Sequence, residues 1–217
     1  MISAIAYDLD GTLCHTLPDL ATAARVVLQT FHRESQSLER IAEHLGDGTQ
    51  TFVHRLLTNH PTQLADPNEH QSAYQCFLEA YANHVCEQSA LYPEVLETLE
   101  AVKQRGISQV VITNKNHHFA VSILEKLGIA PYFSHIYGGD SLPQKKPHPL
   151  PLLTAAKALS LNPAQMLMVG DSENDILAAV AAGSPVVSVS FGYGRLPENP
   201  AHVRAHIKRF GELLHQL

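Results

Sequence analysis

Residues 4–13 read AIAYDLDGTL, a run of strand-forming apolar residues that ends in two carboxylates one residue apart. A strand buried in a sheet normally avoids charge, because burying an unpaired carboxylate costs several kcal/mol. Asp8 and Asp10 are separated by the strand period of two, so both side chains can leave the strand on the same side. Ligands of open α/β sheets bind outside the carboxyl ends of the strands. The stretch therefore predicts a first strand over residues 4–9 that delivers two acids to a functional site.

Short apolar runs alternate with helical patterns from residue 92 onward, which is typical of βαβ units around a parallel sheet. The periodicity predicts helices over residues 94–105, 116–127, 149–159 and 173–182. It predicts further strands over residues 109–113, 135–137, 166–169 and 186–189, and the one at 186–189 is expected to be the last. We therefore expect an α/β fold with a doubly wound, mostly parallel sheet.

The segment over residues 15–89 differs, because it has helical periodicity throughout and no convincing strand. Apolar residues recur there at spacings of three and four in two stripes, Leu20, Ala24, Val27, Leu28 and Phe31, and then Ala73, Tyr74, Phe77, Leu78, Tyr81 and Val85. Such stripes are typical of helices that pack in a core. We therefore expect an α/β core domain made of residues 1–14 and 90–217, with an inserted α-helical cap at residues 15–89.

Charge and cysteine content argue against several classes of protein. The 217 residues are 45% hydrophobic and carry a net charge of −6, which does not suit a surface for nucleic acid or anionic membrane. The three cysteines, Cys14, Cys76 and Cys86, form no CxxC pair, so neither a disulfide framework nor a zinc cluster is expected. The sequence has no recognisable secretory signal or membrane-spanning run. We expect a cytoplasmic protein without nucleic-acid or membrane partners, whose oligomeric state the sequence does not indicate.

Chemically active side chains follow the expected strands at the edge where the first strand ends. Strand ends and the starts of helices would bring together Asp8, Asp10, Thr113, Asn114, Lys146, Asp171 and Asp175. So many acids cannot stay ionised together without a cation, because like charges a few Å apart raise each other's pKa. Oxygen ligands without His or Cys select a hard divalent ion, most simply Mg²⁺. The sequence therefore predicts a magnesium site and a reacting group at this edge.

Four segments resemble the motifs of the haloacid dehalogenase superfamily of aspartate-dependent phosphatases, namely DLDGT at residues 8–12, Thr113-Asn114, Lys146-Pro147 and GDSEND at residues 170–175. The resemblance covers nearly the whole chain, including the helical cap inserted after the first motif. Within the superfamily, the chain is most similar to the bacterial phosphoglycolate phosphatases, on the segments TLPDL at 16–20, GDG at 46–48, VITNK at 111–115, GGDSLP at 138–143 and KPHP at 146–149. It departs from relatives at His15, where they often carry an acidic residue.

The resemblance implies a covalent mechanism in which Asp8 is the nucleophile. Asp8 would attack phosphorus in line and form an aspartyl phosphate. Asp10 would protonate the leaving alkoxide and then, as the base, take a proton from the attacking water. Lys146 would neutralise the charge that builds up on Asp8 and the phosphoryl group. Asp175 would orient Lys146 or a metal-bound water.

The resemblance also implies how metal and phosphate are held. The Asp8 carboxylate, the Asp10 backbone carbonyl and Asp171 would hold Mg²⁺. Thr113 and the backbone amide of Asn114 would donate hydrogen bonds to the phosphoryl oxygens.

The cap offers candidates for contact with the leaving group. Gly46 and Gly48 allow close approach to a ligand, although a simple helix–helix turn would explain the same glycines. Arg55 in the cap and Lys115 in the core are cations that could bind a carboxylate of the substrate. All four are predicted to bind substrate.

Taken together, we expect a Mg²⁺-dependent phosphatase acting on a small phosphorylated metabolite, with 2-phosphoglycolate as the first choice and glycolate and phosphate as products. A sugar phosphomutase, a sugar phosphatase or a pyrophosphatase shares the same catalytic motifs and differs chiefly in the cap. A phospho-accepting receiver domain also combines acids, Mg²⁺, Thr and Lys. Such domains place the acceptor on a later strand and lack a cap, so hydrolysis is the favoured hypothesis.

Overall fold

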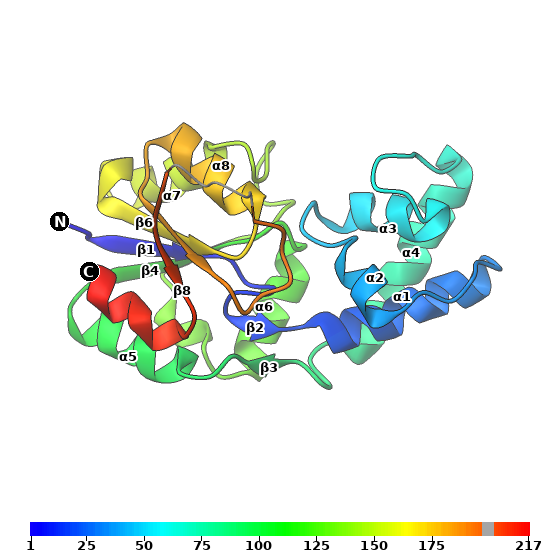
Figure 1. Ribbon diagram of the computed structural model, residues 1–217, viewed down its shortest axis with the longest axis horizontal. Helices are drawn as coiled ribbons and strands as arrows, with labels where there is room; N and C mark the ends of the chain where they lie inside the picture. Colours follow the sequence, from blue (N-terminus) through cyan, green and yellow to red (C-terminus); the bar gives the residue numbers. More distant parts are fainter. Residues whose placement is uncertain (197–201) are drawn as a thin grey trace.

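The computed structural model describes residues 1–196 and 202–217, and its centre is one six-stranded sheet (Figure 1). The strand order is β5-β4-β1-β6-β7-β8, and every neighbouring pair is parallel. These strands are β1 (Ala4–Tyr7), β4 (Ser108–Ile112), β5 (His135–Tyr137), β6 (Met166–Gly170), β7 (Val186–Val189) and β8 (Val203–Ile207). The chain builds outward from β1 on one side through β4 and β5, then on the other side through β6, β7 and β8. The predicted doubly wound sheet is therefore confirmed, with its switch point at β1.

Helices cover both faces of the sheet, and each face has its own apolar cluster. The helices of this part are α5 (Val95–Gln104), α6 (His117–Lys126), α7 (Leu150–Ala158) and α8 (Glu173–Ala182), with short 3₁₀ helices η1 (Ala130–Tyr132), η2 (Pro163–Gln165) and η3 (Phe210–Gln216). Along β1, Ile5 and Tyr7 join the cluster that includes residues of α5 and α6, whereas Ala4 and Ala6 join the cluster under α7 and α8. Because both faces of the sheet are covered, the central strands β1 and β6 are apolar or carry glycine throughout, which is the pattern that made them recognisable.

The expectation that residues 186–189 form the last strand is wrong. Strand β8, Val203–Ile207, pairs in parallel with β7 at the edge of the sheet. Its residues alternate in burial, and Arg204 and His206 are exposed. An edge strand tolerates polar side chains that a central strand excludes, so β8 lacks the continuous apolar run that marks β1 and β6.

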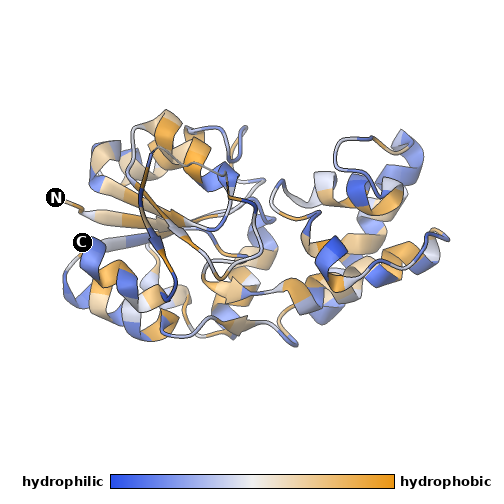
Figure 2. Cartoon of the chain, viewed as in Figure 1, coloured by the Kyte–Doolittle hydropathy of each residue, from blue (hydrophilic) through white to orange (hydrophobic). Residues whose placement is uncertain are grey.

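Four helices, α1 (Leu17–Thr30), α2 (Leu38–Ala42), α3 (Thr49–Thr58) and α4 (Pro67–His84), lie beside the sheet-containing part and pack against one another (Figure 1). Apolar positions are interleaved with polar ones on these helices (Figure 2), and Leu20, Val27, Phe77 and Tyr81 are buried. Helices account for the regular structure between residues 17 and 84. We refer to these helices as the cap, and the domain boundaries at residues 15 and 89 stay a prediction.

Two chain segments connect the cap to the rest of the molecule. They pair through a short antiparallel ribbon, β2 (Cys14–His15) with β3 (Ala90–Leu91), which the sequence did not indicate. Asp19 at the start of α1 is fully buried, and its carboxylate accepts hydrogen bonds from the backbone N–H of Gln88 and of Ser89 (both 2.9 Å). The two connections are thereby tied to each other. Among the described residues, no helix is both long and apolar enough to cross a membrane.

Candidate active site

The ends of three neighbouring strands deliver acids and a hydroxyl to one cavity. Asp8 follows β1, Thr113 follows β4 and Asp171 follows β6, as the parallel arrangement of these strands requires. The cavity lies between this edge of the sheet and the cap. Its described lining is Asp8, Asp10, Leu20, Leu45, Gly46, Gly48, Thr49, Phe52, Phe77, Thr113, Asn114, Lys115, Asp171, Ser172, Tyr193 and Gly194. Six of the predicted site residues, Asp8, Asp10, Thr113, Asn114, Lys115 and Asp171, are thus brought together with Gly46 and Gly48.

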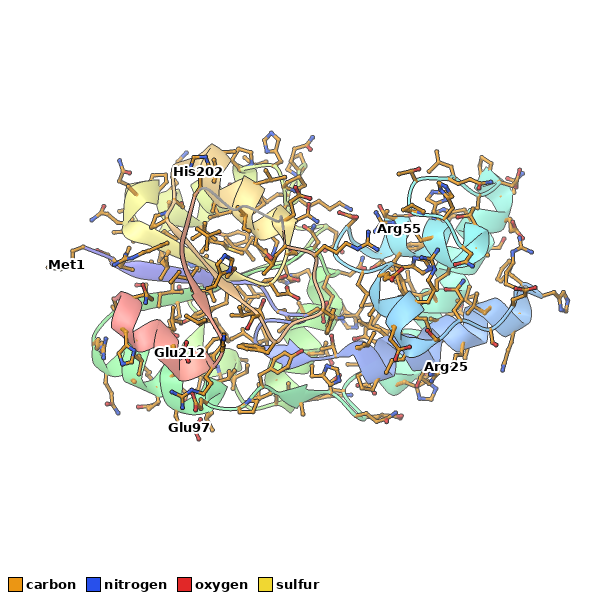
Figure 3. The ribbon with its side chains drawn as sticks, viewed as in Figure 1. Met1, Arg25, Arg55, Glu97, His202 and Glu212 are labelled. Carbon is orange, nitrogen blue, oxygen red and sulfur yellow. The ribbon has the colours of Figure 1, made fainter. Side chains whose placement is uncertain are left out.

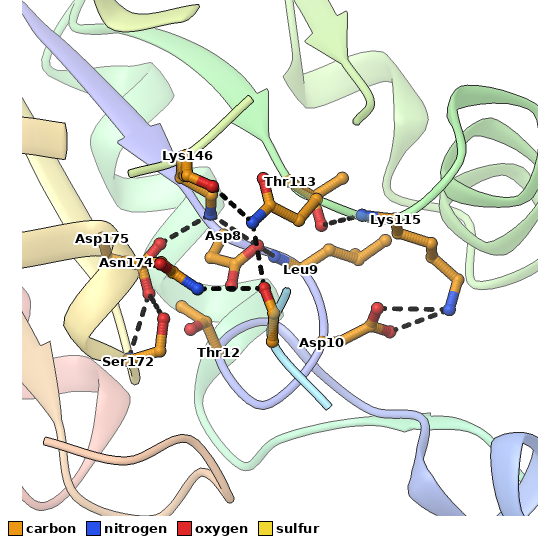
Figure 4. A network of polar contacts seen from close by, with 12 residues as sticks. Asp8, Leu9, Asp10, Thr12, Thr113, Lys115, Lys146, Ser172, Asn174 and Asp175 are labelled. Atoms are coloured by element: carbon orange, nitrogen blue, oxygen red, sulfur yellow. Dashed lines mark hydrogen bonds and ion pairs between the residues drawn. The ribbon is translucent and has the colours of Figure 1, made fainter. Parts of the chain in front are cut away.

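Lys146 lies between two carboxylates at the floor of the site. Its Nζ is 2.9 Å from Asp8 Oδ1 and 2.6 Å from Asp175 Oδ1, and only 2% of the lysine is exposed. Asp175 Oδ2 accepts from the backbone N–H (3.0 Å) and the hydroxyl (2.7 Å) of Ser172, so the first turn of α8 fixes its orientation (Figure 4). Asp175 is therefore held in contact with Lys146, and its orienting role stays a prediction.

Burial opposes the ionisation of Asp8. It raises the pKa of this carboxyl to about 6, even though the Lys146 ammonium acts in the opposite direction. The backbone N–H of Leu9 also donates to Asp8 Oδ1, at 2.8 Å. Both described contacts of Asp8 are to Oδ1, so Oδ2 is the oxygen left for another partner.

Asp171 is held by a loop that sequence reasoning did not single out. The backbone N–H groups of Tyr193 (3.1 Å) and Gly194 (2.8 Å) donate to Asp171 Oδ2. A side chain at Gly192 would collide with the same carboxylate, so this approach requires glycine. Burial, with the nearby charges of Asp8 and Asp175, raises the pKa of Asp171 to about 8. The signal in the sequence was FGYG at residues 191–194, a glycine-containing segment directly after an expected strand.

The donor set is compatible with a bound metal ion. Oxygen atoms of Asp8, Asp171 and Asp175 lie within 4.8 Å of one another, and all three residues are buried. Both oxygens of Asp175 are engaged by Lys146 and Ser172, which leaves Asp8 and Asp171 as the acids with free coordination capacity. Their raised pKa values reflect burial first and the neighbouring carboxylates second, and a cation between the two acids would favour their ionised forms. The Asp10 carboxylate is not part of this acidic group.

Asp10 instead makes contacts of its own on the cap side of the site. Its Oδ1 accepts a hydrogen bond from Thr16 Oγ1 at 2.5 Å, and Lys115 Nζ lies 3.1 and 3.2 Å from its two oxygens. Figure 4 shows this pair standing apart from the group around Lys146. Lys115 is buried, with its Nζ 4.6 Å from the centre of the Tyr81 ring. Burial disfavours the ammonium, but the Asp10 carboxylate and the Tyr81 side chain together outweigh burial and raise the pKa of Lys115.

The cap contributes apolar side chains and backbone to the cavity. Leu20, Leu45, Phe52 and Phe77 form this wall, with Gly46, Gly48 and Thr49 at the start of α3. Among the described lining residues, Lys115 is the one lysine or arginine. A negatively charged leaving group would therefore meet a single cationic side chain.

Arg55 does not belong to the described cavity lining. Its Nη2 pairs with Asp47 Oδ2 at 2.5 Å, while Nη1 and Nε donate to the carbonyls of His44 (3.0 Å) and Pro61 (2.9 Å). Figure 3 labels Arg55 on the cap. The structure therefore places this arginine in a network inside the cap, and not at the cavity where the sequence analysis expected it.

The Asn114 side chain makes two contacts that the sequence analysis did not predict. Its side-chain Nδ2 donates to the carbonyls of Gly46 (2.9 Å) and Lys146 (2.8 Å), which joins the cap loop to the segment that carries the lysine. Thr113 Oγ1 accepts from the backbone N–H of Lys115 at 3.2 Å, and its own proton remains available to a ligand.

Comparison with known proteins identifies the family. A model of haloacid dehalogenase-like hydrolases matches residues 2–183. The chain belongs to the haloacid dehalogenase-like hydrolases. A phosphoglycolate phosphatase of Neisseria gonorrhoeae is 46% identical over 193 residues, which cover 89% of this chain and 82% of the relative. One of Chromobacterium violaceum is 41% identical, with 88% and 86% of the two chains covered. These matches assign this haloacid dehalogenase-like hydrolase to the phosphoric monoester hydrolases.

Solved structures agree with this assignment. A crystal structure described as a predicted phosphoglycolate phosphatase from Haemophilus somnus matches with a TM-score of 0.92 and 34% identity, over 99% of this chain and 97% of the other. The resemblance predicted from the four motifs is therefore confirmed, and it includes the helices of the cap.

Proposed function

We propose that this haloacid dehalogenase-like hydrolase is a Mg²⁺-dependent phosphatase that converts 2-phosphoglycolate to glycolate and phosphate through an aspartyl phosphate on Asp8. The observation that carries the proposal is the Asp8 carboxylate at the end of β1, 2.9 Å from a buried lysine and open to a cavity covered by the cap. The curated relatives named phosphoglycolate phosphatase support the choice of substrate.

In the first step, an oxygen of Asp8 attacks phosphorus while the bond from phosphorus to the ester oxygen breaks. Asp10 transfers its proton to that oxygen, so that glycolate leaves as the hydroxy acid anion. Lys146 counters the negative charge that Asp8 and the phosphoryl group bring together, and Asp175 keeps its Nζ in position. Thr113 and the Asn114 backbone amide donate to the phosphoryl oxygens.

In the second step, water attacks phosphorus and the bond from phosphorus to the Asp8 oxygen breaks, which regenerates the carboxylate. Asp10, now unprotonated, takes the proton of this water. The carboxylates of Asp8 and Asp171, with the Asp10 backbone carbonyl, would hold Mg²⁺. When bound there, the ion supplies positive charge that stabilises the negative phosphoryl oxygens.

Lys115 selects the leaving group. As the one cation of the described lining, it is the partner for a carboxylate on the substrate, and its present partner is Asp10. When a substrate carboxylate binds Lys115, the ion pair between Lys115 and Asp10 weakens, and this happens at the stage of the reaction where Asp10 must transfer a proton. The apolar wall of the cap suits the short carbon chain of a small metabolite better than the many hydroxyls of a sugar.

The proposal is tested by kcat/KM for 2-phosphoglycolate beside ethyl phosphate, pyrophosphate and several sugar phosphates, each with Mg²⁺. Ethyl phosphate matches the size of phosphoglycolate and lacks its carboxylate. We expect a preference for phosphoglycolate over ethyl phosphate that falls about 10- to 100-fold in Lys115→Met, the range for a hydrogen bond to a charged group. Lys157→Met, at an exposed position of α7, is the control. A preference of the unaltered enzyme for a sugar phosphate or pyrophosphate would overturn the substrate assignment.

A further inference from the structure

The loop before α3, residues 46–48, is held by groups from three different parts of the chain. At its centre is Asp47, which neither lines the described cavity nor reaches the catalytic carboxylates. Arg55 of α3 pairs with Asp47 Oδ2 at 2.5 Å, and Asn174 of α8 donates to Asp47 Oδ1 at 2.8 Å. Lys145 Nζ donates to the Asp47 backbone carbonyl at 2.6 Å. Asp47 is thus the point where the cap, α8 and the segment before α7 meet.

The neighbouring glycines bring the same loop against the core. The carbonyl of Gly46 accepts from Asn114 Nδ2 (2.9 Å) and from Asn174 Nδ2 (3.2 Å). At Gly48, a Cβ atom would lie 2.7 Å from Lys145 Nζ and 3.1 Å from the Asn114 carbonyl. The glycine leaves room for the lysine to pass, and its φ of +83° suits glycine. The loop that forms one wall of the cavity therefore depends on core side chains for its position.

Two residues adjoin catalytic groups in the sequence without facing the reacting atoms. Lys145 precedes Lys146, and Asn174 precedes Asp175. Their side chains reach the cap loop, while those of their neighbours reach Asp8 and each other. Any shift of the cap loop is therefore transmitted to the two backbone segments that position the catalytic lysine and its partner.

We propose that Asn174 and Lys145 are positioning residues that hold the cap loop closed over the substrate by binding Asp47, and that Arg55 braces Asp47 for this contact. Arg55 then acts on substrate binding through Asp47, without touching the substrate. The inference rests on the proposed function in one respect, since it takes the closed cavity to be the one in which a phosphate ester is hydrolysed.

The test uses Asn174→Ala, Lys145→Met and Asp47→Ala in the full chain, with Glu173→Ala as the matched control. Glu173 is the exposed neighbour of Asn174 in the first turn of α8. Each of these three variants should lower kcat/KM for 2-phosphoglycolate at least about tenfold, mainly through KM, because each removes one or two of the polar contacts that hold the loop. Melting temperatures should stay close to that of the unaltered enzyme. Asp47→Asn, which keeps an acceptor for Asn174, should recover part of the loss.

A second readout separates positioning from general stability. Hydrogen exchange of the amides of residues 46–49 should slow when inorganic phosphate and Mg²⁺ are added to the unaltered enzyme. In Asn174→Ala and Lys145→Met this slowing should be reduced, whereas Glu173→Ala should behave as the unaltered enzyme does.

Two results would overturn the inference. One is an unchanged KM together with unchanged exchange in both core variants. The other is a loss of kcat that follows a lower melting temperature, since this indicates a structural role. The unaltered enzyme could fail to hydrolyse 2-phosphoglycolate while hydrogen exchange at residues 46–49 still responds to the variants as expected. In that case the proposed substrate is wrong, and the positioning role of Asn174 and Lys145 is supported.

Discussion

Replacing Lys146 by Met should remove activity and also destabilise the protein in a pH-dependent manner. The lysine is buried, and among the described residues it is the one cation in contact with both Asp8 and Asp175. Removing one partner of a buried ion pair costs about 3–5 kcal/mol, because the remaining charge stays buried without compensation. Removing one donor that stabilises a reacting oxyanion typically lowers kcat by about 10²–10³. We expect losses of these sizes in Lys146→Met.

The pH dependence follows from the direction of the pKa shift. Burial raises the pKa of Asp8 to about 6, and Lys146 opposes this rise. The Asp8 carboxyl should therefore have a still higher pKa in Lys146→Met. A carboxyl whose pKa is raised by folding binds its proton more tightly in the folded protein than in the unfolded chain. The destabilisation is therefore largest well above pH 6 and shrinks as the pH falls, because protonation removes the unpaired charge.

Urea unfolding of metal-free protein at about pH 8 and about pH 5 measures this effect. Lys157→Met is the matched control and should change stability by less than about 0.5 kcal/mol. A Lys146→Met variant with native stability at both pH values would refute the reasoning that the lysine compensates two buried carboxylates. Unchanged kcat would refute its role at the phosphoryl group.

Three further predictions concern the metal site, a histidine and a glycine. Asp171→Ala should weaken Mg²⁺ binding at least about tenfold by calorimetry, and chelation of the metal should abolish turnover; activity in excess chelator would contradict this. Burial, with Arg40 and Arg55, lowers the pKa of His44 from 6.5 to about 4, so its contribution to stability is complete above pH 6.5 and is lost as the pH falls toward 4. His44 is 2% exposed but lies close to charges that solvent screens, so we expect this contribution to be about 1 kcal/mol. The measurement is the loss of stability on acidification, which should be smaller in His44→Gln than in the unaltered enzyme. Gly48→Ala should raise KM for phosphoglycolate, because the methyl group meets Lys145 Nζ at 2.7 Å; an unchanged KM would show that the loop tolerates the displacement.

The sequence predicts well the short apolar runs and helical patterns of the α/β part. β5, α8 and β7 begin and end where the pattern places them, and β1, β4 and β6 differ by one or two residues at their ends. Strands β1, β4 and β6 lie inside the sheet, and their ends carry the polar residues of the site. Parallel pairing alone then brings Asp8, Thr113 and Asp171 together.

The remainder depends on contacts between residues that are distant in the sequence. Lys115 and Asp10 pair across 105 positions, and the backbone of Tyr193 reaches Asp171 across 22. Neither contact leaves a periodic signal in its own segment. Arg55 illustrates the same limit, because a charge in a helical pattern does not indicate whether it faces a ligand or an acid of the same domain.

The covalent mechanism requires that Asp8 itself carries the phosphoryl group during turnover. Rapid acid quenching of the enzyme with Mg²⁺ and 2-phosphoglycolate, followed by mass spectrometry of the peptide over residues 4–13, tests it most directly. We expect one phosphoryl group on Asp8 in the unaltered enzyme, none in Asp8→Asn, and no turnover by that variant. Near-normal phosphatase activity in Asp8→Asn, or a phosphoryl group on another residue, would contradict it.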